Sequence, residues 1–151
     1  MDDLRDLYQT VILDHNKAPR NFGSLEDHDR SANGHNPLCG DKLTLELKLD
    51  ADERVTDLRF NGMGCAISTA SASLMTEFAR GKTKDEILAT KERFHEMLTG
   101  NPNEESDTDD LGKLAVFGGV REFPARVKCA TLSWHTMEAA LADGESMATT
   151  E

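Results

Sequence analysis

Four leucines at alternating positions constrain the fold of this chain more than any other feature. Between residues 43 and 49, a polar residue separates each leucine from the next. This alternation is typical of a β-strand with one buried and one solvated face. Residues 50–53 can turn the chain, and residues 54–60 again place apolar side chains on one side. The pattern therefore predicts a β-hairpin.

Outside this hairpin, apolar residues recur three or four positions apart, which is the spacing of helices. One helix is predicted before a polar loop over residues 16–40, and further helices are predicted after the hairpin. One of these later helices has the capping-box residues Thr83 and Glu86, and the last begins at Pro124. The expected buried positions are Leu4, Leu7, Tyr8, Val11, Ile12, Ile67, Ala70, Leu74, Phe78, Ile87, Phe94, Leu98, Val127, Ala130, Trp134, Met137 and Leu141. This order of elements predicts an α+β fold.

The chain has 151 residues, a length at which one domain with a single core is expected. We therefore predict one domain over residues 1–151, with residues 144–151 as a frayed tail. Residues 104–110 hold five acids among seven positions and are expected to form a solvated loop that ends by capping a short helix over residues 111–117.

The net charge of −11 argues against nucleic acid or an anionic membrane as a partner. No apolar run approaches the roughly 20 residues that a membrane span needs. The first residues lack the basic start and apolar stretch of a secretory signal. A cytoplasmic location is expected, and thiols stay reduced in that compartment.

Three cysteines stand far apart, each in a different kind of backbone. Cys39 lies in a loop, Cys65 ends a glycine-rich turn, and Cys129 lies just inside the last helix. With Asp41, they supply three thiolates and one carboxylate, a donor set that a tetrahedral zinc ion accepts. An odd number of cysteines does not suit a disulfide framework. The spacing alone also allows each cysteine to be a small core residue, because no close C-x-x-C pair is present.

The local sequence around these residues favours a shared ion. Cys39 and Asp41 are two positions apart, so in an extended segment both side chains point to one side. Cys129 lies near the start of its helix, where the helix dipole favours a thiolate. Lys128 and Arg126 could offset the two surplus negative charges that three thiolates and a carboxylate leave around a divalent ion.

Two other sets of side chains have structural interpretations. The five histidines share no ligand spacing and are expected to be capping or surface residues; they are His15, His28, His35, His95 and His135. A serine and threonine cluster at the start of a helix is expected to serve capping and packing, because no base is visibly paired with it; it comprises Ser68, Thr69, Ser71 and Ser73.

Motifs over most of the chain resemble the U-type iron–sulfur cluster assembly family, which includes IscU-type and NifU N-terminal domains. They are Leu7-Tyr8-Gln9-Thr10-Val11-Ile12-Leu13-Asp14-His15, Pro19-Arg20-Asn21-Phe22-Gly23, Asn36-Pro37-Leu38-Cys39-Gly40-Asp41, Gly62-Met63-Gly64-Cys65-Ala66-Ile67-Ser68 and Lys128-Cys129. The stretch from Leu111 to Trp134 resembles the SufU branch in particular, as does the long segment between Phe94 and Leu111.

Two positions differ from the scaffold branch of this family. That branch has a histidine directly before the last cysteine, where this chain has Lys128, and a lysine is a poor cluster ligand because its amine is protonated. It also has a Leu-Pro-Pro-Val-Lys chaperone motif, where this chain reads Phe123-Pro124-Ala125-Arg126-Val127-Lys128. Transfer of a nascent cluster through that chaperone is therefore not expected.

The resemblance implies a small antiparallel three-stranded sheet packed against several helices, as in SufE/NifU-like folds. It also implies a zinc-dependent sulfurtransferase of the SUF system, with Cys39, Asp41, Cys65 and Cys129 as metal ligands. The expected partners are a SufS-type cysteine desulfurase, which holds pyridoxal phosphate, and downstream iron–sulfur assembly proteins. In this mechanism a histidine of the desulfurase replaces one zinc ligand, and the released thiolate accepts persulfide sulfur.

Cys39 is the expected acceptor, because a loop between Gly34 and Gly40 carries it while a helix and the sheet hold the other two cysteines. Asp41 would hold the ion while Cys39 moves. Two alternatives remain open. One is a scaffold on which iron or a [2Fe–2S] cluster occupies the same ligands before transfer to apo-proteins. The other is a non-catalytic zinc module that only binds or regulates the desulfurase.

Overall fold

The order of helices and strands along the chain is mixed, as expected for an α+β domain. The structure is a computed structural model that describes residues 2–37, 40–99, 111, 114, 115, 117, 118, 120, 124–143 and 145–149. Its elements are α1 (Asp2–Lys17), β1 (Arg30–Asn36), β2 (Asp41–Leu49), β3 (Val55–Met63), α2 (Ala66–Ala79), α3 (Lys84–Thr99), α4 (Pro124–Asp143) and β4 (Glu145–Thr149).

The four strands form one sheet in the order β3-β2-β1-β4. The predicted hairpin is present as β2 and β3, and the antiparallel pairing of β1 with β2 completes the expected three-stranded unit. Strand β4 then adds to the free edge of β1 in parallel, with Ser31 opposite Glu145. Residues 145–149 are thus part of the sheet, where the sequence predicts a frayed tail.

Strand β1 lies within the segment that was predicted to be a polar loop. Its sequence, RSANGHN, carries no large apolar residue, so the alternation that reveals a strand is missing. The positions that face the core are instead small or polar, namely Ala32, Gly34 and Asn36. Helix α4 explains the small residues, because a Cβ on Gly34 would collide with Thr136 and lie 3.1 Å from a Leu132 methyl carbon. The loop prediction for this segment was therefore wrong.

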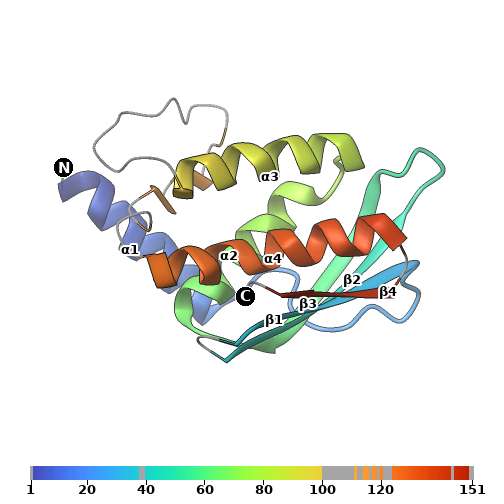
Figure 1. Ribbon diagram of the computed structural model, residues 1–151, viewed down its shortest axis with the longest axis horizontal. Helices are drawn as coiled ribbons and strands as arrows, with labels where there is room; N and C mark the ends of the chain where they lie inside the picture. Colours follow the sequence, from blue (N-terminus) through green and yellow to red (C-terminus); the bar gives the residue numbers. More distant parts are fainter. Residues whose placement is uncertain are drawn as a thin grey trace.

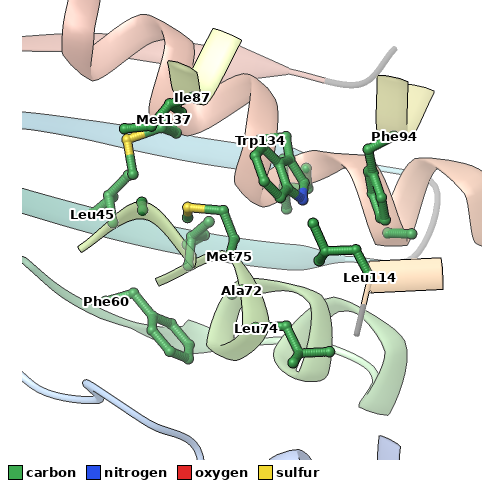
Figure 2. Close-up of a cluster of buried hydrophobic side chains, with 14 of the residues drawn as sticks. Leu45, Phe60, Ala72, Leu74, Met75, Ile87, Phe94, Leu114, Trp134 and Met137 are labelled. Atoms are coloured by element: carbon green, nitrogen blue, oxygen red, sulfur yellow. The ribbon is translucent and has the colours of Figure 1, made fainter. Parts of the chain in front are cut away.

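Helices α2 and α4 cover one face of the sheet, with α1 packed on α2 and α3 packed on α4 (Figure 1). Figure 2 shows the core between these layers, where Leu45 of the sheet, Met75 of α2 and Met137 of α4 belong to one cluster of buried side chains. Trp134 stacks against Phe94 with ring centroids 5.4 Å apart, which joins α4 to α3. The buried stripe predicted for the last helix is confirmed at Ala130, Trp134, Met137 and Leu141.

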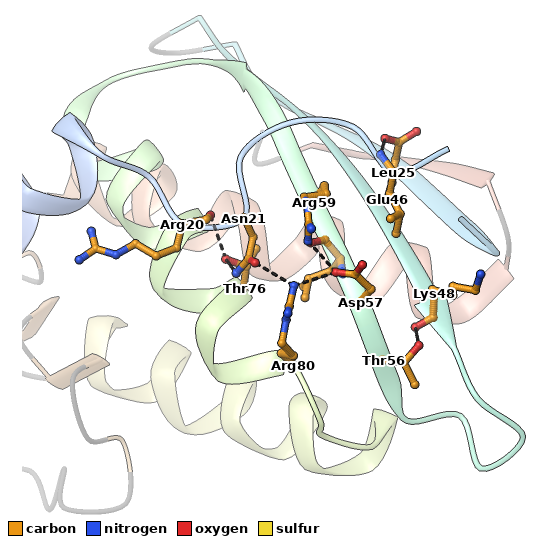
Figure 3. A network of polar contacts seen from close by, with 11 residues as sticks. Arg20, Asn21, Leu25, Glu46, Lys48, Thr56, Asp57, Arg59, Thr76 and Arg80 are labelled. Carbon is orange, nitrogen blue, oxygen red and sulfur yellow. Dashed lines mark hydrogen bonds and ion pairs between the residues drawn. The ribbon is translucent and has the colours of Figure 1, made fainter. Parts of the chain in front are cut away.

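A polar network fastens the segment after α1 to the sheet and to α2 (Figure 3). Arg59 and Arg80 both donate to Asp57 Oδ1, at 2.6 and 2.7 Å, and Arg80 also donates to Asn21 Oδ1 at 2.9 Å. Asn21 in turn donates to Thr76 Oγ1 at 3.2 Å. Residues far apart in sequence are thereby joined on the outside of the core.

The capping box predicted at the start of α3 is confirmed. The backbone N–H of Thr83 donates to Glu86 Oε1 at 3.1 Å, and the backbone N–H of Glu86 donates to Thr83 Oγ1 at 3.3 Å. The hydrogen bond from Thr83 lowers the pKa of Glu86. The acidic segment 104–110 lies outside the described residues. No helix in the described part of the chain is long and apolar enough to cross a membrane.

Candidate metal centre

Three elements bring potential metal ligands to one point at the end of the sheet. Asp41 is the first residue of β2, Cys65 immediately precedes α2, and Cys129 lies in the second turn of α4. One ligand atom from each of these residues lies within 4.8 Å of the other two. In the part of the chain that the structure describes, this is the one group of three or more such side chains that gathers in this way.

Asp41 is fully buried, and backbone and side-chain donors orient its carboxylate. Oδ1 accepts the backbone N–H of Cys65 at 2.9 Å, and Oδ2 accepts from Asn36 Nδ2 at 3.1 Å. Among the described residues, no cationic side chain forms an ion pair with it. Burying a carboxylate without a compensating cation is costly, and a bound metal ion would supply that charge.

Cys65 occupies the N-cap of α2, where its Sγ accepts the backbone N–H of Ser68 at 3.4 Å. The end of a helix that carries free N–H groups favours negative charge, and therefore favours a thiolate there. The glycines before it allow the close approach that was predicted. Gly62 has φ +142°, and a Cβ at that position would collide with the carbonyl of Lys42 on the neighbouring strand.

Cys129 is fully buried, and its sulfur faces the hairpin that contains β1 and β2. Asn36 Nδ2 lies 3.6 Å from its Sγ, and the thiol also reaches the carbonyl of Ala125 at 3.7 Å. Arg126 is exposed and Lys128 half-buried, and neither forms an ion pair with a described residue. Their suggested role in offsetting charge stays a prediction.

Cys39 lies outside the described residues, so its role as ligand and acceptor stays a prediction. Leu38 is likewise outside them, whereas Pro37 and Gly40 are described as turn residues between β1 and β2. Asn36 and Asp41 are the last paired residues of the ladder, and the N–H of Gly40 donates to the carbonyl of Asn36 at 2.8 Å. The loop predicted between Gly34 and Gly40 starts later than expected, because β1 continues through Gly34 to Asn36.

The donor set fits a zinc ion. Two sulfurs and one carboxylate oxygen lie within 4.8 Å of one another, and ligand atoms of a tetrahedral zinc site lie about 3.5–4 Å apart. A small inward shift of each side chain would suffice to bind the ion. The fourth position could be filled from the adjoining hairpin turn.

His15 corrects one expectation from the sequence. It is buried rather than a capping or surface residue, and its Nδ1 lies 2.6 Å from Ser73 Oγ. Its Nε2 is 3.6 Å from Glu77. Ser73 therefore does have a histidine beside it. Ser73 is nevertheless fully buried and also accepts the backbone N–H of Arg20 at 2.9 Å, so we still interpret it as a packing residue. The helical spacing of His15 from Val11 and Ile12 could have revealed that His15 is buried.

A second histidine contact joins α3 to α4. The rings of His95 and His135 lie 6.2 Å apart and line a shallow cavity of about 250 Å³ with Lys91, Glu92 and Glu96. Burial lowers the pKa of His135, and the nearby charges of Lys91 and His95 lower it further. Among the described residues, these side chains are not part of a group of three potential metal ligands.

Asn36 is the residue of the site that sequence reasoning missed. Its side chain contacts two of the gathered ligands, although it was quoted only as part of a motif. Its pairing with Asp41 across the hairpin turn depends on β1, the strand that the sequence did not reveal. Once that hairpin is known, Asn36 stands out as a polar residue that faces the core opposite Asp41, and this position would indicate its role in the site.

The comparisons with known proteins agree with this geometry. The family model described as the NifU-like N terminal domain matches residues 7–130. The chain belongs to this family. The zinc-dependent sulfurtransferase SufU of Bacillus subtilis is 46% identical over 143 residues, which cover 95% of each chain. The iron–sulfur cluster assembly scaffold protein IscU of Streptococcus pyogenes is 40% identical, over 93% of this chain and 86% of the relative.

A solved structure has the same fold. It is a SufU protein of Fervidobacterium islandicum, described as an iron–sulfur cluster assembly scaffold protein for the SUF system. It is 38% identical with a TM-score of 0.81, over 89% of this chain and 96% of that chain. The resemblance to the U-type family, and to its SufU branch, is therefore confirmed.

Gly64→Ala should weaken metal binding by displacing Asp41. A Cβ at position 64 would lie 2.7 Å from Asp41 Oδ1 and 3.2 Å from its Cγ, so the carboxylate has to shift. We expect faster loss of metal to a chelator and a destabilisation of about 1–3 kcal/mol. Gly118→Ala is the matched control, because its Cβ would meet only Met97 Sδ at 3.7 Å. Wild-type metal retention in Gly64→Ala would contradict Asp41 as a ligand.

The lowered pKa of His135 predicts a loss of stability in acid. Because the unfolded chain binds the proton more readily than the folded protein, the free energy of unfolding falls as pH drops below the ordinary value of 6.5. Urea unfolding at pH 7.5 and pH 5 should show a smaller decrease for His135→Gln than for wild type. His95→Gln should reduce the decrease in part. An equally steep decrease in His135→Gln would show that this histidine does not contribute.

Proposed function

We propose that this protein is a zinc-dependent sulfurtransferase of iron–sulfur cluster assembly, which accepts persulfide sulfur from a cysteine desulfurase on Cys39. The observation that supports this most is the gathering of Asp41, Cys65 and Cys129 within 4.8 Å, around a buried carboxylate that lacks an ion-pair partner among the described residues. By sequence, Cys39 belongs to the short connection between β1 and β2, and Asp41 of this group is the first residue of β2. The identity to SufU of Bacillus subtilis supports the same activity.

Bound zinc would be held by Cys39, Asp41, Cys65 and Cys129, and it would keep the thiols from oxidising without itself changing redox state. We expect Cys39 to be the ligand that leaves. Cys65 caps a helix and Cys129 is buried within another, whereas Cys39 belongs by sequence to the connection between β1 and β2. Asp41 is oriented by two N–H donors and can keep its place while the turn moves.

The transfer itself is an exchange between sulfur atoms. The Cys39 thiolate attacks the outer sulfur of the persulfide on the desulfurase, and a new sulfur–sulfur bond forms on Cys39. The sulfur–sulfur bond on the desulfurase breaks at the same time, and its cysteine leaves as a thiolate. The outer sulfur keeps its oxidation level and its proton, so no further oxidant or reductant is needed.

A sulfur donor is implied for this family by the role of its members in iron–sulfur assembly. We propose that the donor is a SufS-type desulfurase that holds pyridoxal phosphate, and that later iron–sulfur assembly proteins receive the sulfur. We place this exchange in the cytoplasm, where thiols stay reduced.

A scaffold function is the second candidate, and the 40% identity to IscU of Streptococcus pyogenes favours it. The same ligands would then bind iron or a [2Fe–2S] cluster. Lys128 is a reason to prefer sulfur transfer, because a protonated amine next to Cys129 cannot add a cluster ligand.

Metal analysis of freshly purified protein separates these two functions. Sulfur transfer predicts one tightly bound zinc per chain and a colourless protein, because zinc has no visible d–d absorption. Elemental analysis and an absorption spectrum measure both properties. A red-brown protein with stoichiometric iron and sulfide would favour the scaffold instead.

Cys39→Ala should abolish sulfur acceptance. We expect no mass increase of one sulfur atom after incubation with the desulfurase and cysteine, and no stimulation of desulfurase turnover. Asp41→Ala is the comparison, because it keeps Cys39 while a ligand position opens to water and zinc binds less firmly. If Cys39→Ala binds zinc and stimulates turnover as wild type does, Cys39 carries no sulfur. The third alternative, a regulatory zinc module, would then be favoured.

A further inference from the structure

The side chain of Asn36 connects two of the candidate metal ligands. Asn36 is the last residue of β1 and is fully buried. Its Nδ2 donates to Asp41 Oδ2 at 3.1 Å and to Cys129 Sγ at 3.6 Å. Asp41 begins β2, whereas Cys129 belongs to α4, so one amide group joins a ligand of the sheet to a ligand of the helix layer.

We propose that Asn36 is a positioning residue of the metal centre, whose amide group sets the relative placement of Asp41 and Cys129 and thereby the affinity for zinc. This inference rests on the metal site of the proposed function. It adds a residue that is not itself a ligand and acts only through the two ligands that it contacts.

The orientation of this amide is determined by its neighbours. A carboxylate and a thiolate both accept hydrogen bonds, so only the NH₂ end of the amide can face them favourably. Turning the side chain around would place Oδ1 against two negatively charged atoms. The observed orientation leaves Asn36 Oδ1 buried without a hydrogen-bond partner in the described structure.

That unpaired oxygen argues for a role beyond fold stability. A buried acceptor without a partner costs about 1–3 kcal/mol, and an apolar side chain of similar size would avoid this cost. The amide recovers part of it through its two donor contacts, and both of those contacts go to candidate metal ligands. The amide of Asn36 therefore orients the ligands, whereas an apolar side chain would contribute more to packing.

The charge of the site gives the physical reason. Three thiolates and one carboxylate around a divalent ion leave a net charge of −2, in a position where Asp41 and Cys129 are fully buried. N–H dipoles that point at the ligands stabilise such charge, and orienting partners of this kind are common around metal ligands. Asn36 supplies such a dipole to both buried ligands.

The main chain of Asn36 has a separate contact that a side-chain substitution leaves in place. Its carbonyl accepts the N–H of Gly40 at 2.8 Å and closes the hairpin turn. A substitution at position 36 thus removes the link between Asp41 and Cys129 without removing this backbone hydrogen bond. The effect on the ligands can be measured with the turn still closed.

The test compares three substitutions at position 36 in the full-length zinc protein. Asn36→Ala removes the donors, Asn36→Leu removes them but keeps the branched skeleton of the side chain, and Asn36→Asp replaces them with a negative charge beside Asp41 and Cys129. Zinc affinity is measured by competition with a chromogenic chelator. We expect a 10–100-fold loss for Asn36→Ala and Asn36→Leu, as found for other residues that orient metal ligands, and a larger loss for Asn36→Asp.

Asn33→Ala is the matched control, because Asn33 lies on the same strand but is exposed, and its Oδ1 accepts a hydrogen bond from Thr44 Oγ1 at 2.8 Å instead of a contact with a metal ligand. A second measurement separates positioning from simple destabilisation. The visible spectrum of the Co²⁺-substituted protein reports ligand geometry, and it should change in Asn36→Leu but not in Asn33→Ala. Circular dichroism identifies any variant that fails to fold, and the result is then read from the Asn36 variant, Ala or Leu, that does fold.

Each outcome has a distinct meaning. If folded Asn36→Ala or Asn36→Leu keeps wild-type zinc affinity and the wild-type Co²⁺ spectrum, the inference is overturned while the proposed function stands. If wild-type protein binds no zinc, both are overturned. Loss of zinc affinity in the Asn36 variants, with wild-type zinc affinity and Co²⁺ spectrum in Asn33→Ala, supports the inference, whether or not sulfur transfer is later observed.

Discussion

The burial of the Asp41 carboxylate is the constraint on which the rest of the site depends. A fully buried negative charge needs compensation, and here it is surrounded by an amide of β1, a backbone N–H before α2 and a thiol of α4. These groups come from segments that are distant in sequence. Their meeting point therefore exists only when the hairpins and the two covering helices are all in place.

Two rigid helices of the fold hold the thiols that meet at this point. Helices α2 and α4 cover the sheet, and the core around Leu45, Met75 and Met137 fixes their positions. Cys65 caps α2 and Cys129 lies within α4, so these two thiols are held in place by the covering helices.

The elements that could be predicted from the sequence are those with a clear apolar periodicity. The leucines of β2 alternate with polar residues, and the buried stripe of α4 recurs at helical spacing, so both elements were predictable. Strand β1 was not, because its core-facing positions are Ala32, Gly34 and Asn36 and carry no apolar alternation. Strand β4 pairs along the edge of β1 and was missed together with it.

The sequence by itself determined the donor chemistry, because three thiols and a neighbouring carboxylate are properties of residue type and the motifs around them identify the family. Only the tertiary structure decided which groups orient these ligands. The amide of Asn36 reaches Asp41 across a hairpin and Cys129 across 93 positions of sequence, and no local pattern encodes a contact of that range. Packing of α4 against β1 brings them together, and the small residue Gly34 permits that approach.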